Sequence, residues 1–279
     1  MKLTKVGALA ATALFAFAAC NSGGSGSAAP SAGASGATGG DTSKGTVNIA
    51  IELPQQGSEL AASEPIINGI KLAVKLAGGT AGGYKLDIPQ SAIYDDALNG
   101  AHDPQTGANN MSKVVADENT VAVIGPLNSS VAAAQIPISN EAGLLQCSPA
   151  NTNPDLTKGQ PAKDLRTKPN NYIRVVTTDD VQGPAAAQYI HEVLKKNSVY
   201  IIDDTETFGK GVADAFDKEF KAEGGTVVKH DAAPKTTQDY VSIMTAAKAL
   251  TTSRGELDAT GSDESSWSKD RRVDIVLGS

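Results

Sequence analysis

A short apolar run passes directly into a hydroxyl-rich loop in the stretch Val121-Ala-Val-Ile-Gly125-Pro126-Leu-Asn-Ser-Ser130. The pattern returns in Gly143-Leu-Leu-Gln-Cys147, which is followed by Ser148-Pro-Ala-Asn-Thr-Asn153. Short apolar runs bounded by turn residues predict buried strands. Strand and helix patterns alternate along most of the chain. This alternation predicts an α/β fold in which helices flank parallel sheets.

The loop after the first run is a candidate binding site, because a helix is predicted to begin at Ser129. A helix N-terminus presents backbone N–H groups without intrahelical partners and a partial positive charge. With the hydroxyls of Ser129 and Ser130, it offers a place for a carboxylate or a similar small anion. Ligands of open α/β sheets lie beyond the carboxyl ends of the strands, where this loop is expected. The alternative is that the two serines only cap the helix.

The composition favours binding without chemistry. The chain has 279 residues, 40% of them hydrophobic and 4% aromatic, and a net charge of −7. We expect no nucleic-acid partner, because no basic block is present. His191-Glu192 begins a zinc-protease pattern, but Lys195 stands where the second histidine is required, and no Gly-x-Ser-x-Gly or nucleotide-binding glycine motif occurs. We therefore predict no catalytic residue, metal or cofactor, and we expect His102, His191 and His230 on the solvated surface.

The first residues predict export and anchoring. Residues 1–20 form a lipoprotein signal peptide, with Lys2 and Lys5 before an apolar run too short to span a bilayer. The run ends in Phe17-Ala-Ala-Cys20, which resembles the bacterial lipoprotein signal in which the cysteine is lipidated. Cleavage after Ala18 is the alternative. Residues 21–45 are rich in Gly, Ser and Ala and predict a flexible tether. We expect a protein that is lipid-anchored to the cell membrane on its extracytoplasmic face.

The body divides into two runs of strands and helices. The first lobe is predicted over residues 46–177, a partial second lobe over 178–250, and a disordered polar tail over 251–279. Strands are predicted at Thr46–Leu53, Tyr84–Tyr94, Thr120–Ile124, Leu144–Ser148, Tyr172–Val176, Ser198–Asp203 and Thr226–His230. Helices are predicted at Glu64–Ala77, Pro104–Asp117, Ser129–Glu141, Val181–Lys196, Gly209–Glu223 and Tyr240–Leu250, and a long loop at Pro149–Pro169. Two such lobes form a natural clamp.

Several motifs from Val47 to Leu250 resemble a known family. They are Tyr94-Asp95-Asp96, His102-Asp-Pro104, Val123-Ile-Gly125 with Ser129-Ser130, Ser148-Pro-Ala-Asn-Thr-Asn-Pro-Asp-Leu-Thr157, Val181-Gln-Gly-Pro184 and Asp204–Gly211. Their order and spacing resemble the amino-acid-binding proteins of bacterial branched-chain amino acid ABC importers, which have the type I periplasmic-binding-protein fold. The resemblance implies a two-lobed monomer that binds an amino-acid-like ligand and delivers it to an ABC permease.

The resemblance also implies which residues touch the ligand. Ser129 would contribute its hydroxyl and N–H, Ala150 a carbonyl, and Thr152 its hydroxyl and N–H. Phe208 would supply an aromatic wall, and Asp179 matches a polar position near the cleft mouth. The other interpretations are a turn role for Thr152, a core role for Phe208 and a helix-capping role for Asp179.

The chain departs from the family pattern after Leu250. A hydrophobic strand, an acidic ligand contact and further strand–helix units are expected there, but the sequence is polar except for Val273–Leu277. We expect a truncated or frame-shifted chain with an incomplete second lobe. A ligand-sensing lipoprotein of the same fold, without transport, is the alternative function, and an extracellular enzyme that depends on Ser129 is a third.

Overall fold

The computed structural model describes residues 40, 42–255 and 275–277. The predicted signal peptide with Cys20, most of the tether and most of the polar tail lie outside these residues. The ordered body begins slightly before the predicted boundary at Thr46, because backbone bonds already join Lys44 N to Gly83 O at 3.0 Å and Lys85 N to Gly45 O at 2.8 Å. Within the described part of the chain, no helix is both long and apolar enough to cross a membrane.

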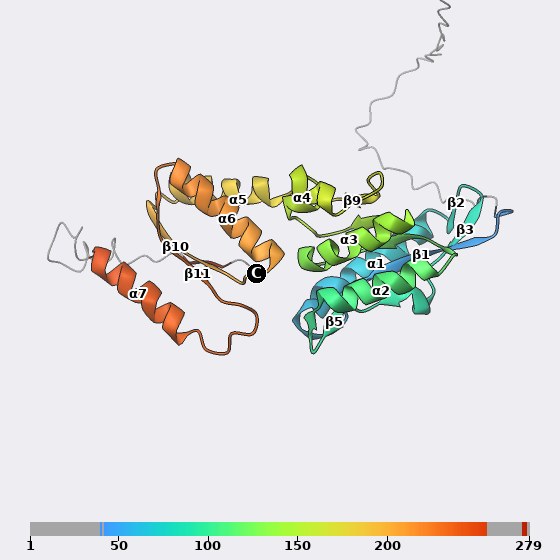
Figure 1. Cartoon of the computed structure of the whole chain (residues 1–279), viewed down its shortest axis with the longest axis horizontal. Coiled ribbons are helices and arrows are strands. Elements are labelled where there is room, and N and C mark those ends of the chain that lie inside the picture. The colour runs from blue at the N-terminus through green and yellow to red at the C-terminus, as the bar shows by residue number, and fades with distance from the viewer. Residues whose placement is uncertain (1–39, 41, 256–274, 278–279) are drawn as a thin grey trace, which may run out of the picture. The chain divides into compact units, whose positions relative to one another are not determined.

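The first lobe is built on a mainly parallel sheet (Figure 1). Its path is β2-β3-β1-β7-β8-β9, and the short β4 pairs with β1. The strands are β1 (Thr46–Glu52), β2 (Thr80–Ala81), β3 (Tyr84–Asp87), β4 (Ile93–Tyr94), β7 (Thr120–Ile124), β8 (Leu145–Ser148) and β9 (Tyr172–Arg174), with a separate hairpin of β5 (Ala97–Leu98) and β6 (Ala101–His102). The helices are α1 (Leu60–Leu76), α2 (Pro104–Ala116), α3 (Ser129–Ala142) and α4 (Gly159–Asp164), with 3-10 turns η1 (Gly57–Glu59), η2 (Gln90–Ala92) and η3 (Pro154–Leu156).

The core of this lobe lies between the sheet and the neighbouring helices α2 and α3 (Figure 1). Met111 and Val114 of α2 pack on Ala50 of β1 and Val123 of β7. A second cluster joins α3 to η3 and β9 through Ala132, Ile136, Leu156 and Tyr172. Leu145 and Ile173, which alternate with buried residues of β8 and β9, are exposed. The helices described here therefore cover only part of the sheet surface.

The second lobe contains the parallel strands β11-β10-β12 and helices on both faces of β10. Its elements are α5 (Asp179–Gln188), a π-helical turn η4 (Tyr189–Val193), β10 (Ser198–Asp203), α6 (Thr207–Ala222), β11 (Thr226–Ala232), α7 (Val241–Gly255) and β12 (Ile275–Leu277). Residues of β10 alternate between two cores, as expected for a buried strand. Val199 and Ile201 pack on Phe216 and Phe220 of α6, whereas Tyr200 and Ile202 pack with Ala247 of α7.

Several predicted elements are wrong in detail. The predicted strand Tyr84–Tyr94 is interrupted by η2, and the predicted loop Pro149–Pro169 contains η3 and α4. Helix α6 begins at Thr207 rather than at Gly209, so Phe208 lies in the helix instead of the loop.

The tail prediction also needs correction at both ends. Helix α7 continues past Leu250 to Gly255. Ile275–Leu277, inside the tail expected to be disordered, forms β12 and pairs with Tyr200–Ile202 of β10. A hydrophobic strand therefore does follow Leu250, after an interval that lies outside the described residues.

Candidate functional site

The candidate site lies where the strand order of the first sheet reverses. From β1 the chain moves to β3 on one side, and it then continues through β7, β8 and β9 on the other. Crevices at such a reversal, beyond the carboxyl ends of the strands, are the usual ligand sites of open α/β sheets. Gly125 makes the close approach possible, because a Cβ at this position, with φ of 141°, would lie 1.9 Å from the Glu52 carbonyl oxygen.

The loop after β8 is held by buried side chains. Ser148 Oγ donates to Pro126 O at 2.9 Å and accepts from Asn151 N at 2.9 Å and Ala150 N at 3.2 Å. Asn151 donates through Nδ2 to Leu127 O at 2.8 Å. The loops that follow β7 and β8 therefore form one rigid unit, and Ala150 is part of it.

Three of the residues predicted to bind ligand come together around this loop. Ser129 is the first residue of α3 and is 2% exposed, and its Oγ accepts a long bond of 3.4 Å from Asn153 N. Thr152 precedes Asn153, and its carbonyl accepts from Asp179 N at 3.0 Å. Ser130 follows Ser129 in the first turn of α3 and is half-buried. The chain thus brings hydroxyls and a carboxyl group to one helix end.

Asp179 is the most unusual of these residues. It lies in the first turn of α5 and is fully buried, yet neither carboxylate oxygen has a hydrogen bond. Burial raises its pKa, while the neighbouring Thr152 hydroxyl and the Arg174 guanidinium act in the opposite direction. The Thr152 hydroxyl is itself buried and makes no hydrogen bond of normal geometry. A buried carboxylate beside an unpaired hydroxyl favours a positively charged or N–H-donating ligand.

Sequence reasoning missed Asn153 and Arg174. Asn153 donates through Nδ2 to Thr207 O at 2.7 Å and accepts from Asp155 N at 2.9 Å, which ties the loop to the start of α6. Arg174 donates to the carbonyls of Asn151 at 3.1 Å and Asn153 at 2.8 Å. The Asn- and Pro-rich composition of the loop was the available signal. Phe208, the residue after Thr207, is half-buried at this helix start.

Two buried carboxyl groups lie near the same edge of the sheet. Glu52 ends β1, Asp96 follows β4, and neither is exposed. The two carboxyl groups interact electrostatically, and Glu52 Oε1 accepts from Asn110 Nδ2 at 3.4 Å, but neither Asp96 oxygen has a hydrogen bond of normal geometry. Burial raises the pKa of Glu52 well above its usual range and that of Asp96 to about 7. The adjacent Asp95 points elsewhere and accepts from the backbone N–H groups of Gln55 and Ala97, so it holds a turn.

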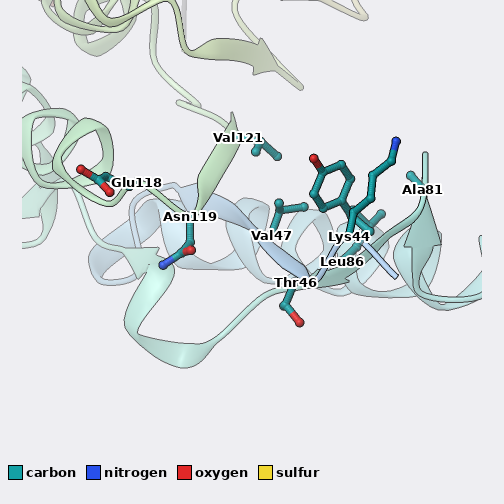
Figure 2. A pocket seen from close by; sticks show the side chains of 9 residues that line it. Lys44, Thr46, Val47, Ala81, Leu86, Glu118, Asn119 and Val121 are labelled. Atoms are coloured by element: carbon teal, nitrogen blue, oxygen red, sulfur yellow. The ribbon is translucent and has the colours of Figure 1, made fainter. Parts of the chain in front are cut away.

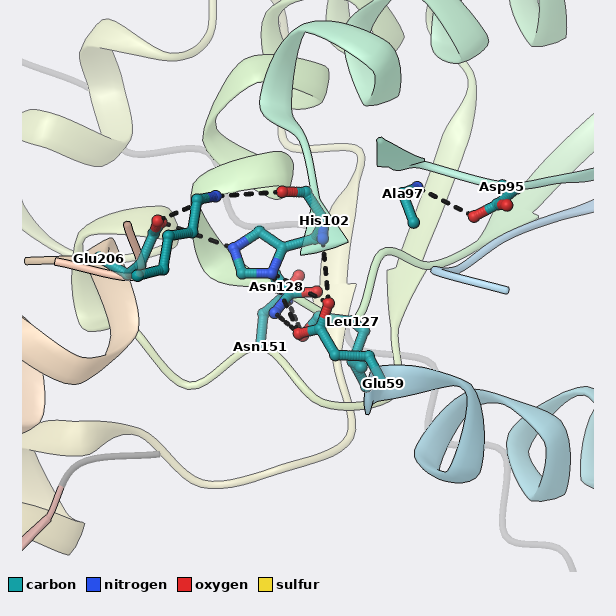
Figure 3. Close-up of polar contacts among 9 residues, drawn as sticks. Glu59, Asp95, Ala97, His102, Leu127, Asn128, Asn151 and Glu206 are labelled. Atoms are coloured by element: carbon teal, nitrogen blue, oxygen red, sulfur yellow. Dashed lines mark hydrogen bonds and ion pairs between the residues drawn. The ribbon is translucent and has the colours of Figure 1, made fainter. Parts of the chain in front are cut away.

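The prediction that the histidines lie on the solvated surface is wrong for His102, and His191 and His230 are half-buried. The His102 imidazole lies between Glu59 and Glu206 (Figure 3). His230 Nε2 lies 2.7 Å from Asp203 Oδ2. His191 packs edge-on against Phe220, with ring centroids 5.8 Å apart. No group of three or more His, Cys, Asp or Glu side chains within the described residues is arranged to hold a metal ion.

A surface hollow lies at the opposite, amino-terminal edge of the first sheet (Figure 2). Thr46 and Val47 of β1 and Val121 of β7 line it, and Lys44 lies 5.4 Å from the centroid of the Tyr84 ring. The hollow is therefore separate from the loops that gather Ser129, Thr152 and Asp179.

The chain is similar to proteins of one family. The family model described as periplasmic binding protein matches residues 46–252. A Leu/Ile/Val-binding protein, BraC3, of Rhizobium johnstonii is 32% identical over 206 residues, which cover 73% of this chain and 52% of the relative. A leucine-specific-binding protein of Salmonella typhimurium is 30% identical over 199 residues, which cover 71% and 50%. The chain thus spans about half the length of these relatives.

Solved structures share the fold. A leucine-binding protein, LivK, of Thermotoga maritima has a TM-score of 0.66 and 21% identity, and the match covers 83% of this chain and 63% of that protein. The substrate-binding protein LivJ of Streptococcus pneumoniae, solved with isoleucine, has a TM-score of 0.62 and 20% identity, with 83% and 64% covered. These likenesses concern the arrangement of helices and strands alone.

Proposed function

Because the chain belongs to the periplasmic binding protein family, whose members bind solutes and are not enzymes, we propose that it takes part in binding an amino acid outside the cytoplasm for an ABC importer. The relatives named for binding leucine, isoleucine and valine support a branched-chain amino acid as the ligand class. The observation that carries the proposal is the convergence of Ser129, Thr152 and the unpaired carboxylate of Asp179 at one loop.

In the proposed site, the α-carboxylate and the α-ammonium of the amino acid bind to two different groups of residues. The N-terminus of α3, with the hydroxyls of Ser129 and Ser130, receives the α-carboxylate. Asp179 and the Thr152 hydroxyl receive the α-ammonium, with the Ala150 carbonyl as a further acceptor. An ammonium group would give the buried Asp179 carboxylate the partner it lacks, which offsets the free-energy cost of burying that charge. Phe208 would contact the ligand side chain from the second lobe.

Attachment to the membrane is a second part of the proposal. It rests on the sequence of residues 1–20, in which Cys20 is the proposed lipidation site. A lipid at Cys20 would hold a monomeric binding protein at the extracytoplasmic face of the cell membrane, near an ABC permease. Metabolic labelling with a radioactive fatty acid tests it: we expect label in the wild type and none in Cys20→Ser.

Binding is tested by thermal unfolding with an excess of leucine, isoleucine or valine. A ligand at 100 times its dissociation constant stabilises the folded state by about 2.7 kcal/mol. N-acetyl-leucine lacks the ammonium group and leucinamide lacks the carboxylate, so neither should match leucine. Asp179→Asn should abolish the stabilisation, whereas Asp180→Asn, at the exposed neighbour that pairs with Lys158, should retain it. Equal stabilisation of both variants, or none in the wild type, would contradict the proposed site.

A further inference from the structure

The His102 side chain faces one carboxylate from each lobe. Its Nδ1 lies 3.0 Å from Glu59 Oε1, in the turn η1 of the first lobe. Its Nε2 lies 3.5 Å from Glu206 Oε2, at the residue that precedes α6 in the second lobe. The imidazole is 12% exposed, and both carboxylates are about one-fifth exposed, at 22% and 21%. Figure 3 shows the ring between Glu59 and Glu206.

The first-lobe half of this arrangement is fixed by additional bonds. Glu59 Oε2 accepts from His102 N at 3.1 Å, and Glu59 Oε1 accepts from Asn128 Nδ2 at 2.7 Å. Asn128 is the residue that precedes α3, so Glu59 joins the segment after β1 to the loop after β7. Contacts within the first lobe alone therefore hold His102 in a defined position.

The second-lobe half consists of Glu206 and Lys235. Lys235 Nζ lies 3.1 Å from Glu206 Oε1 and donates to the His102 carbonyl at 3.1 Å. Lys235 belongs to the segment between β11 and α7. Two separate segments of the second lobe thus meet the same first-lobe residue, one at its side chain and the other at its backbone.

We propose that His102, Glu206 and Lys235 form a latch between the two lobes, and that the latch is tight when His102 is protonated and loose when it is neutral. A protonated imidazole donates an N–H from each ring nitrogen, so it can satisfy Glu59 and Glu206 together. A neutral imidazole has one N–H and no charge. The two carboxylates then flank an uncharged ring and repel each other.

The charges around His102 favour the protonated form. Burial lowers its pKa, but Glu59 raises it by hydrogen bonding and charge, and Glu206 raises it further. Lys235 acts in the opposite direction. Asp96 and Asp103 also interact electrostatically with the ring. The net pKa of His102 is raised, so the latch is present below this pKa and is lost as the pH rises through it. Lys235 keeps its bonds to Glu206 and to the His102 carbonyl above that pH, so the loosened lobes stay in contact.

The first test measures the His102 pKa by NMR in the full chain. If the latch forms in solution, Glu206→Gln should lower the pKa of His102, because a charge from the other lobe is removed. Glu192→Gln, a matched change at an exposed residue of the second lobe, should leave it unchanged. An unaltered His102 pKa in Glu206→Gln would overturn the proposal, because it would mean that the two lobes do not meet at this ring.

The second test measures the distance between lobes directly. Spin labels are attached at Lys71→Cys in α1 and Lys218→Cys in α6, two exposed positions, with both native cysteines replaced by serine. We expect a narrow distance distribution at about pH 5.5 and a broader one at about pH 8.5. Glu206→Gln should give the broader distribution at both values. Distributions that do not change with pH, or that change equally in Glu206→Gln, would refute the latch.

Neither measurement needs a bound amino acid. A failure of ligand binding would therefore leave the latch intact, and a failure of the latch would leave the proposed ligand site intact. The two proposals stand on different residues, and the variants that test one do not alter the other.

Discussion

The buried pair of Glu52 and Asp96 makes folding depend on pH in a direction opposite to that of most carboxyl groups. The pKa of Asp96 rises from 3.8 to about 7 because its carboxyl is buried. Between these pH values the folded chain keeps a proton that the unfolded chain has released. The free energy of unfolding therefore falls as the pH rises through this interval. Glu52, whose pKa is also raised, extends the fall to higher pH.

The size of the effect follows from the pKa of Asp96. One pKa unit corresponds to about 1.4 kcal/mol, so a rise from 3.8 to about 7 gives a loss of roughly 4 kcal/mol at most. Asp96→Asn keeps the shape of the side chain and cannot ionise. At about pH 8 we expect this variant to be more stable than the wild type by about 1 to 4 kcal/mol, and at about pH 4 to differ by less than about 1 kcal/mol.

Urea unfolding followed by circular dichroism at several pH values measures this difference. Titrating groups that do not interact with Asp96 contribute equally to wild type and variant, so only the difference between them is used, and any change in Glu52 is part of that difference. Glu118→Gln, at an exposed residue, is the matched control and should follow the wild type. If the free energies of wild type and Asp96→Asn change in parallel from about pH 4 to about pH 8, the pKa of Asp96 is not raised by folding and the reasoning is wrong.

Three further predictions concern stability. Gly125→Ala should prevent folding or lower the free energy of unfolding by more than about 3 kcal/mol, because the new Cβ would lie 1.9 Å from the Glu52 carbonyl oxygen. Gly143→Ala, with no atom within 4 Å of the new Cβ, should cost only about 1 kcal/mol. Equal melting temperatures for the two variants would contradict this prediction. Phe220→Ala should cost about 3–5 kcal/mol in urea unfolding, because the ring is fully buried; a loss below 1 kcal/mol would show that the core of the second lobe is packed differently. Asn153→Ala should destabilise the chain by about 1–3 kcal/mol and speed amide exchange at the start of α6, since it removes a partly buried hydrogen bond of 2.7 Å to Thr207 O. Unchanged exchange there would be evidence against the contact.

The sequence predicted those elements whose burial is set by local pattern. Thr120–Ile124 and Ser198–Asp203 match β7 and β10 at both ends, because their apolar residues are bounded by turn residues. The start of α3 at Ser129 is also as predicted. The segment Tyr84–Tyr94 is predicted as one strand, but it contains Pro89 and Gln90. In the structure β1 pairs first with β3 and then with β4, and η2 interrupts the strand between them.

The candidate site was only partly predictable for a different reason. Ser129, Thr152 and Asp179 stand next to strand ends or helix starts, which is a local signal. The role of Asn153 depends on Thr207, 54 residues away in sequence, and that of His102 on Glu206, which follows it by more than 100 residues. No spacing rule connects such pairs. From sequence alone, an isolated histidine in a polar segment is predicted to be solvated, because the carboxylates that contact it come from distant parts of the chain.

The buried pair of Glu52 and Asp96 in the first lobe and the buried Asp179 at the start of α5 have different surroundings. Glu52 and Asp96 interact with each other, so the ionisation of each responds to the charge of the other, while Asn110 Nδ2 donates to Glu52 Oε1 at 3.4 Å. Asp179 is equally buried and has no hydrogen bond of normal geometry, and the side chains that act on its carboxyl group are the Thr152 hydroxyl and the Arg174 guanidinium. If this position had only a structural role, an asparagine would be more stable there, because a buried carboxylate without a hydrogen-bond donor destabilises the fold. The position of this carboxylate at the loop that also carries Ser129 and Thr152 therefore favours a ligand that brings a hydrogen-bond donor.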